Sequence, residues 1–233
     1  MTWKLSEIAA MTAGELHGSD LDMDSVATDS RAVKGDQLFI AIKGDRFDAH
    51  DFVADLEGVA GAALVSQLVD CDLPQIVVTD TRVALASFAA AWRAQFKKPL
   101  IGLTGSNGKT TVKEMLSAIL LQKGSVLATL GNLNNDLGMP LTLLRLRDEH
   151  DYAVIEMGAN HFGEIEFLTN ISKPDVAILN NAGAAHLEGF GSIEGVSRAK
   201  AEIFQGLDDS GVAIINADDQ YADYWKGCNE GRE

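Results

Sequence analysis

The second part of the chain alternates between short apolar runs and longer segments whose apolar residues fall on one helical face. The apolar runs predict strands near residues 100–104, 125–129, 152–157, 175–180 and 211–216. Helical patterns follow most of these runs. Alternation of this kind is typical of a parallel sheet with helices on its faces.

The first part of the chain predicts shorter elements. A helix is expected around Leu5 to Met11, and strands are expected at residues 26–28, 37–42, 62–65 and 75–78. Strands and a helix of this size indicate a small α/β domain.

A longer helix, from Asp80 to Phe96, separates the two parts. Its apolar face consists of Leu85, Phe88, Trp92 and Phe96. The residues Lys97-Lys98-Pro99 follow, and basic residues with a proline are typical of a helix end. We therefore expect an α/β protein with two domains, residues 1–97 and residues 98–233.

The composition limits the possible partners. The chain has 233 residues, a net charge of -15 and 46% hydrophobic residues, which predicts an acidic, soluble globular protein. This charge disfavours nucleic acid or an anionic membrane as the main partner, although it allows a local basic pocket for phosphates. The sequence shows neither a spanning stretch of about 20 apolar residues nor a signal peptide, so we expect a cytoplasmic protein. Cys71 and Cys228 lie far apart without metal-ligand spacing, which predicts reduced thiols.

A glycine-rich loop joins the first strand of the second part to the following helix. The strand is Pro99 to Leu103, and the loop consists of Thr104, Gly105, Ser106, Asn107, Gly108, Lys109, Thr110 and Thr111. The expected apolar face of the helix consists of Val112, Met115, Leu116, Ile119 and Leu120. This arrangement is typical of a phosphate site, because glycines let backbone N–H groups face a phosphate at the positive end of the helix.

Two side chains of the loop fit such a site. Lys109 would reach the β- and γ-phosphates of a nucleotide, and the Thr110 hydroxyl would ligate Mg²⁺. The strict P-loop pattern has a glycine five residues before Gly108, where this chain has Leu103, so the loop is a shortened variant. The alternative is an ordinary glycine-rich turn between a strand and a helix.

Polar residues follow three other predicted strands, at the edge of the sheet where ligands gather. Glu156 either holds Mg²⁺, directly or through water, or is satisfied by a helix N-terminus. His186 lies in a glycine-bearing loop and is either structural or in contact with a metal or a substrate. Asn132, Asn134 and Asn135 either form turns or hydrogen-bond a sugar or a peptide.

Lys200 occupies an unusual position on the helix predicted after His186. Ser192 is the expected N-cap of this helix, and the apolar stripe holds Ile193, Val196, Ile203, Phe204 and Leu207. Lys200 falls within that stripe, so its side chain either snorkels to the rim or is buried. Burial favours the neutral amine, which can add CO₂ to form a carbamate, a carboxylate-like ligand for Mg²⁺.

Seven segments spread along nearly the whole chain resemble one protein family. They are residues 28–31, 44–52, 104–111, 131–135, 156–160, 181–191 and 199–204. Together they are similar to the ATP-dependent Mur ligases of bacterial peptidoglycan synthesis. The shortened phosphate loop is shared by the wider family, including folylpolyglutamate synthase, whereas the stretches Arg46 to His50 and Ala185 to Gly189 look specific to one member.

The resemblance implies an ADP-forming ligase that joins D-alanyl-D-alanine to UDP-N-acetylmuramoyl-tripeptide, with ATP and Mg²⁺ as cofactors. ATP would phosphorylate the terminal carboxylate of the tripeptide, and the amine of the dipeptide would attack the acyl phosphate. The first domain would hold the UDP end, and the second would be a P-loop ATPase domain. The family carries a third, C-terminal domain that closes over the site. We therefore expect this chain, which ends at Glu233, to be a monomeric fragment with an incomplete second domain.

The resemblance also implies the functions of single side chains. The implied UDP contacts are Ser30, Arg31, Asp48 and His50, in loops 28–31 and 45–50, and the other implied substrate contacts are Asn132, Asn134 and Asn135. The implied catalytic residues are Lys109, Glu156, His186 and Lys200. Thr110 and Glu156 would position one Mg²⁺, and His186 with carbamylated Lys200 would serve a second one.

Two other classes of function stay open. Another P-loop enzyme, such as a small-molecule kinase or folylpolyglutamate synthase, would share the phosphate loop, but the segments Asp29 to Arg31 and Arg46 to His50 argue against it. A truncated chain could also bind a nucleotide or a UDP-sugar without ligation. Binding of a UDP-sugar rather than folate separates the first class from the ligase.

Overall fold

The computed structural model describes residues 2–44 and 46–232, and the chain divides into two compact units between Ala91 and Trp92. Asp45, at the start of one predicted substrate loop, lies outside the described residues. Helix α2 (Thr81–Arg93) is shorter than the expected helix, which extends to Phe96. Beyond Arg93 the backbone N–H groups of Gln95 and Phe96 bond three residues back, and the Arg93 guanidinium donates to the Phe96 carbonyl at 2.6 Å. The chain therefore turns tightly and leaves the helix before Phe96.

Five parallel strands form the sheet of the second unit, as the sequence predicts. They are β8 (Leu100–Thr104), β9 (Val126–Ala128), β10 (Tyr152–Glu156), β11 (Val176–Leu179) and β12 (Val212–Ile215). The strands lie side by side in the order β12-β11-β8-β10-β9. The chain thus runs from β8 to β9 and β10 on one side, and returns to β11 and β12 on the other. Ligands of open α/β sheets bind where the strand order reverses in this way.

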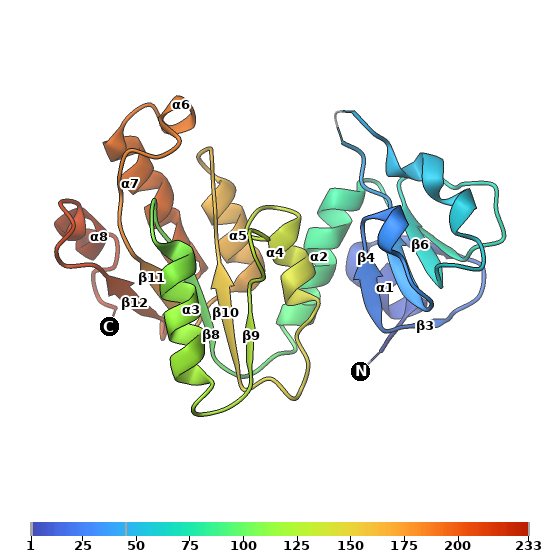
Figure 1. The fold of residues 1–233 in the computed structure, drawn as a ribbon, viewed down its shortest axis with the longest axis horizontal. Helices are drawn as coiled ribbons and strands as arrows, with labels where there is room; N and C mark the ends of the chain where they lie inside the picture. Colours follow the sequence, from blue (N-terminus) through green and yellow to red (C-terminus); the bar gives the residue numbers. More distant parts are fainter. Residues whose placement is uncertain (1, 45, 233) are drawn as a thin grey trace. The chain divides into compact units, whose positions relative to one another are not determined.

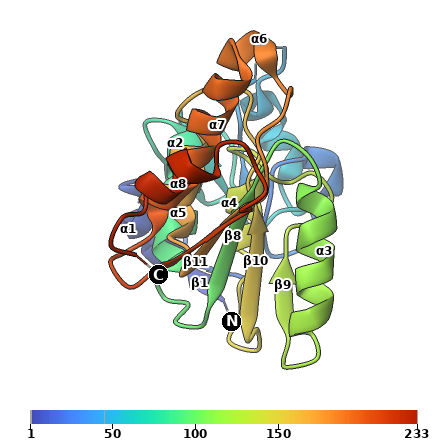
Figure 2. The same cartoon turned by 90° about the vertical axis from the view of Figure 1, so that its left-hand side faces the viewer.

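Helices cover both faces of this sheet (Figure 1). Figure 2 shows helix α3 (Lys109–Leu120) on one face, and α5 (Glu164–Ser172) and α7 (Ile193–Ala201) on the other. The other helical segments are α4 (Gly138–Leu143), α6 (Leu187–Phe190), the 3₁₀ segment η4 (Glu202–Gly206) and α8 (Ala222–Gly227). Crossovers between parallel strands are right-handed, so connections that run in opposite directions along the sheet place their helices on opposite faces. The connection from β8 to β9 through α3 runs one way, and those from β10 to β11 through α5 and from β11 to β12 through α7 run the other way.

The first unit has its own five-stranded sheet. Its strands are β4 (Ser25–Ala27), β5 (Gln37–Ile40), β6 (Ala62–Val65), β7 (Gln75–Val77) and β2 (Glu15–His17), in the order β2-β7-β6-β5-β4. All neighbouring pairs are parallel except β2 with β7. The remaining elements are α1 (Leu5–Thr12), the pair β1 (Trp3–Lys4) and β3 (Asp22–Met23), and the 3₁₀ segments η1 (Ser30–Ala32), η2 (Ala49–Phe52) and η3 (Ala54–Leu56). The sequence does not predict β1, β2 and β3, because each of them contains a single apolar residue and therefore shows no apolar run.

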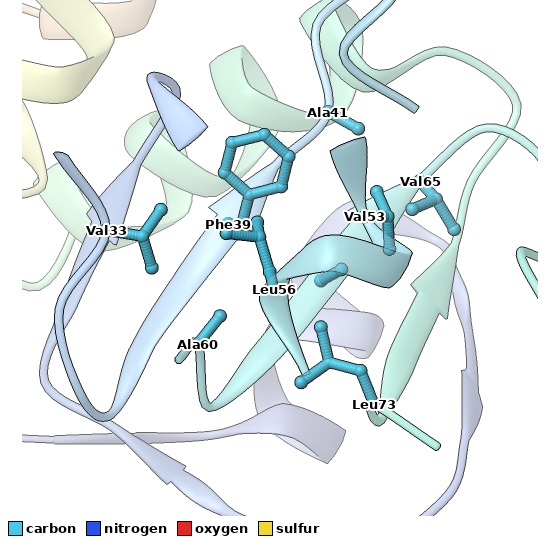
Figure 3. Close-up of a cluster of buried hydrophobic side chains, with 9 residues drawn as sticks. Val33, Phe39, Ala41, Val53, Leu56, Ala60, Val65 and Leu73 are labelled. Carbon is cyan, nitrogen blue, oxygen red and sulfur yellow. The ribbon is translucent and has the colours of Figure 1, made fainter. Parts of the chain in front are cut away.

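A compact apolar cluster holds this first sheet to the loops above it (Figure 3). Its buried members are Val33, Phe39, Ala41, Val53, Leu56, Ala60, Ala63, Val65 and Leu73. They come from β5, β6, η3 and the segments that flank these elements, and Val33 and Val53 directly follow η1 and η2, so the cluster fixes the loops that carry the predicted UDP contacts. Burying each large side chain of this kind stabilises the fold by roughly 1.5–3 kcal/mol.

The buried face of α3 differs from the prediction. Met115 and Ile119, placed on the apolar face from the sequence, are 62% and 63% exposed. The residues fully buried on this helix are Lys113 and Ser117, while the apolar side chains beside them are only partly buried. A hydrophobic period cannot anticipate this rotation, because it scores a lysine as outward even where the fold offers the ammonium a buried acceptor.

No helix within residues 2–44 and 46–232 is both long enough and apolar enough to pass through a bilayer.

Candidate functional site

The predicted phosphate loop lies between β8 and α3. Thr104 ends β8, and its buried hydroxyl donates to the carbonyl of Met157 at 2.8 Å, which ties the loop to the end of β10. Gly108 directly precedes α3 with φ +73°, a conformation that favours glycine. At Gly105 an added Cβ would lie 3.2 Å from the backbone nitrogen of Asn181. Gly108 therefore allows the positive φ before α3, and Gly105 allows the close approach of the Asn181 backbone.

Two asparagines that the sequence did not single out hold the loop from the side of β11. The carbonyl of Asn181 accepts from the Ser106 N–H at 3.0 Å, and its side-chain oxygen accepts from the Asn107 N–H at 2.9 Å. The Asn180 amide donates to the Asn107 carbonyl at 2.9 Å. The only sequence signal for this clamp is a pair of amides at the end of a buried strand. The contact of these amides with the loop can be predicted only once β11 is known to lie beside β8.

Lys109 bends back over the loop. Its Nζ donates to the carbonyls of Gly105 and Ser106 at 2.8 and 3.2 Å. Burial lowers the pKa of Lys109, and the nearby Glu156 carboxylate acts in the opposite direction. The ammonium is thus held inside the loop, at the point where a bound phosphate would contact the N-terminus of α3.

Glu156, at the end of β10, contacts the loop directly. One carboxylate oxygen accepts from the Thr110 hydroxyl at 3.0 Å, and the other accepts from the Asn134 amide at 2.7 Å. Glu156 is only 2% exposed. A hydroxyl and a carboxylate side by side form an all-oxygen donor set, which matches the ligand preference of Mg²⁺. The oxygen atoms of Thr110 and Glu156 therefore fit Mg²⁺ as ligands.

These residues surround a cavity of about 490 Å³. Its lining residues are Ser106, Asn107, Gly108, Lys109, Thr110, Thr111, Gly131, Asn132, Asn134 and Glu156. The structure thus brings together most of the predicted loop, the two predicted ligands of the first Mg²⁺ and two of the three predicted asparagines. Asn135 instead accepts from the Gly138 N–H at 2.8 Å at the start of α4, which is the turn alternative for this residue.

Lys200 and His186 do not line this cavity, and both lie near the ring of Phe190. The Lys200 Nζ is 3.5 Å from the Ala159 carbonyl and 5.6 Å from the centroid of the Phe190 ring. The exposed His186 ring centroid is 6.5 Å from the Phe190 centroid. Within residues 2–44 and 46–232, no three His, Cys, Asp or Glu side chains gather to hold a metal.

The structure decides between the two alternatives for the Lys200 side chain, because it is buried. Ser192 caps α7, its hydroxyl accepting from the Gly195 N–H at 3.0 Å, and Lys200 on the same helix is 1% exposed. Burial, with a smaller contribution from the charge of Lys109, lowers the pKa of Lys200 to about 8. The side chain therefore does not snorkel, and a neutral amine is accessible near neutral pH.

Two of the predicted UDP contacts in the first unit, Arg31 and His50, each pair with a neighbouring carboxylate. Arg31 forms an exposed ion pair with Asp29 at 2.7 Å, which lowers the pKa of Asp29 to about 2. Buried His50 lies between Asp48 and Ser66, with Nδ1 2.5 Å from Asp48 Oδ1. Its Nε2 accepts from the Ser66 N–H at 2.8 Å, so the proton of the neutral ring is on Nδ1, facing Asp48. Ser66 is a partner that the sequence pattern did not indicate.

Sequence comparison identifies relatives of the chain. Residues 103–232 match the Mur ligase middle domain. The UDP-N-acetylmuramoyl-tripeptide--D-alanyl-D-alanine ligase of Escherichia coli strain K12 is 55% identical over 215 residues, which are 92% of this chain and 48% of that protein. The protein of the same name from Bacillus subtilis is 40% identical over 225 residues, 92% of this chain and 49% of its own. The chain thus spans about half the length of these relatives.

Solved structures give the same result. A crystal structure of MurF from Acinetobacter baumannii superimposes with a TM-score of 0.96 at 41% identity, covering 100% of this chain and 52% of that one. MurF ligase from Thermotoga maritima, solved in complex with ADP, superimposes with a TM-score of 0.82 at 36% identity, covering 91% of this chain and 49% of that one.

Proposed function

Because this chain belongs to the Mur ligase family, we propose that it is the UDP-binding and ATP-binding part of a ligase. The proposed enzyme joins D-alanyl-D-alanine to UDP-N-acetylmuramoyl-tripeptide and forms ADP. One observation carries the proposal: the Lys109 loop and the Thr110–Glu156 pair share one cavity at the reversal of strand order. The relatives named for this reaction support the substrate assignment.

The residues of the loop have distinct tasks in this proposal. Lys109 leaves the loop carbonyls to contact the transferring phosphoryl group, and the backbone N–H groups at the start of α3 bind the other phosphate oxygens. Thr110 and Glu156 would hold Mg²⁺, which neutralises charge on the phosphates when bound. Asn180 and Asn181 keep the loop in shape, so that little reorganisation accompanies phosphoryl transfer.

The remaining predicted site residues enter the proposal by their positions. Ser30, Arg31 and the Asp48–His50 segment contact the UDP end, in the domain that we assign to residues 1–97. Asn132 and Asn134 line the cavity and face the substrate. His186 and carbamylated Lys200 would hold a second Mg²⁺ on the side of Phe190. We propose a monomer that works in the cytoplasm, where ATP and UDP-linked precursors are made.

Calorimetry on the chain tests the binding part of this function. The chain should bind MgADP and UDP-N-acetylmuramoyl-tripeptide with dissociation constants of roughly millimolar or tighter, and should not bind a folate substrate. Folate binding without UDP-sugar binding would support the folylpolyglutamate synthase alternative. In the full-length protein, ADP release should require both the tripeptide and D-alanyl-D-alanine. Binding of both ligands without any ADP release would support the non-catalytic alternative.

Loss of the His50 ring should lower the stability of the first unit. His50→Ala removes the imidazole partner of Asp48 and the acceptor of the Ser66 N–H, and we expect a loss of about 1–3 kcal/mol in the free energy of unfolding. UDP-sugar binding should weaken as well, because His50 and its partner Asp48 are both predicted UDP contacts. Urea unfolding and calorimetry measure the two effects. Lys43→Ala is the control, because it removes an exposed side chain 3.4 Å from Asp48. A His50→Ala protein as stable as this control would contradict the stabilising role of the His50 ring.

A further inference from the structure

Lys113 is a buried charged residue that the proposed reaction does not use. It lies one turn into α3, and its side chain is only 1% exposed. Its Nζ donates to the carbonyl of Thr129 at 2.7 Å and lies 2.9 Å from a carboxylate oxygen of Glu114. A buried lysine is costly unless its donors are satisfied, so these contacts explain how the fold tolerates it.

The contact with Thr129 replaces a bond of the sheet. In the β9–β10 pair Val154 is the partner of Ala128, so the next ladder bond would run from the Glu156 N–H to the Thr129 carbonyl. The Glu156 N–H instead donates to the Thr129 side-chain hydroxyl at 2.9 Å. The Thr129 carbonyl, which would accept the ladder bond, accepts from the Lys113 Nζ instead. Regular pairing of β9 with β10 therefore stops at Thr129.

The loop released at this point reaches the proposed magnesium ligand. Residues 130–135 follow Thr129, and Asn134 of this loop donates to the Glu156 carboxylate at 2.7 Å. The carbonyl of Asn134 accepts from the Gly158 N–H at 2.8 Å, just after β10. The backbone of Glu156 is thus held by Thr129, and its carboxylate is held by the loop that begins after Thr129.

We propose that Lys113 is a positioning residue for Glu156. By withdrawing the Thr129 carbonyl from the ladder, it makes Thr129 present its hydroxyl to Glu156 and directs the following loop over the carboxylate. Lys113 itself contacts neither the nucleotide nor the metal. This inference rests on the proposed function only in so far as Glu156 binds Mg²⁺, since the placement of the loop follows from the contacts themselves.

Hydrogen exchange on the unliganded chain tests the placement. Lys113→Met keeps the length of the side chain but cannot donate, and we expect amide exchange in residues 129–135 to become about tenfold faster or more. Lys113→Arg keeps a donor and should restore most of the protection. Ser117→Ala is the matched control, because Ser117 is buried on the same helix and its hydroxyl donates to the Lys113 carbonyl within α3. Equal loss of protection in Ser117→Ala and Lys113→Met would overturn the proposal, as would normal protection in a folded Lys113→Met protein.

The magnesium dependence of ADP binding tests the consequence. In Lys113→Met we expect affinity for ADP with Mg²⁺ to fall about tenfold, while affinity for ADP in EDTA changes less than about twofold. Thr129→Val removes the acceptor of the Glu156 N–H. It should change amide exchange and the magnesium dependence of ADP binding in the same direction as Lys113→Met does. This variant decides the question if Lys113→Met does not fold. Unchanged magnesium dependence in the folded variants would overturn the proposal. If the unmodified chain binds ADP equally well with and without Mg²⁺, the proposed magnesium site fails, while exchange still tests the placement of the loop.

Discussion

Lys109→Ala in the full-length protein is expected to lower ATP-dependent acyl phosphate formation by about a thousandfold, while UDP-sugar binding stays unchanged. The physical reason is the position of the ammonium. It lies inside the phosphate loop, against two carbonyls, and next to the first turn of α3. From there a short movement brings it to the phosphate that carries the developing charge. The predicted UDP contacts belong to the other unit of the chain, so their ligand should still bind.

Two measurements separate the effects of this substitution. Phosphate exchange or trapping of the acyl phosphate reports the chemical step, and calorimetry with UDP-N-acetylmuramoyl-tripeptide reports the first unit. Lys123→Ala is the control, because it removes an exposed lysine just beyond the other end of α3. Near-normal acyl phosphate formation in Lys109→Ala would contradict the P-loop assignment. Loss of UDP-sugar binding as well would show that the substitution disturbs more than the loop.

The sheet of the second unit could be predicted because its strands are short runs of mostly apolar residues. Strands such as β8 and β10 are nearly continuous apolar runs, which parallel sheets covered on both faces require. The phosphate loop was also predictable, since its residue types and its position after a strand are local properties. Both features depend on neighbours in the sequence.

The contacts that hold the site depend instead on residues far apart in the sequence. Asn181 and Ser106 meet only because β11 lies beside β8, and Ser66 meets His50 only because their loops lie on the same side of the first sheet. Strand order is not encoded in any periodic pattern. The same reason explains α3: Lys113 is inward because Thr129 offers a carbonyl, and Met115 is outward as a consequence of that rotation.

Lys200 is the position at which a local pattern did predict an unusual environment. Its place on the apolar stripe of α7 left burial and snorkelling open; the structure buries the side chain, and burial lowers its pKa from the ordinary value of 10.5 to about 8. At pH 7.5 about a quarter of such amines are neutral, compared with about a thousandth for an ordinary lysine. The neutral amine attacks CO₂, an N–C bond forms and one proton is released. The product is a carbamate.

Carbamylation of Lys200 should therefore be detectable on the chain itself. With ¹³C-labelled bicarbonate, we expect a carbamate signal that is lost in Lys200→Ala. Because the folded pKa is lowered to about 8, the amine is protonated below that pH, and at constant dissolved CO₂ the signal should grow as the pH rises from 7 to 9. Acidification should release the CO₂. A signal unchanged in Lys200→Ala, or one that appears only near the pKa of a surface lysine, would contradict carbamylation at this residue.

The same residue predicts the second large loss of activity. In the full-length protein, Lys200→Ala should reduce ligation by about a hundredfold, because the second magnesium position loses a negatively charged ligand. Formate or acetate in the buffer should restore part of the activity, since a small carboxylate can occupy the space of the missing carbamate. Arg198→Ala is the matched control: Arg198 lies on α7 but points to solvent and pairs with Glu194 at 2.6 Å. Steady-state rates with and without the carboxylate provide the measurement. A Lys200→Ala enzyme as active as Arg198→Ala would mean that Lys200 only fills the core beneath Phe190.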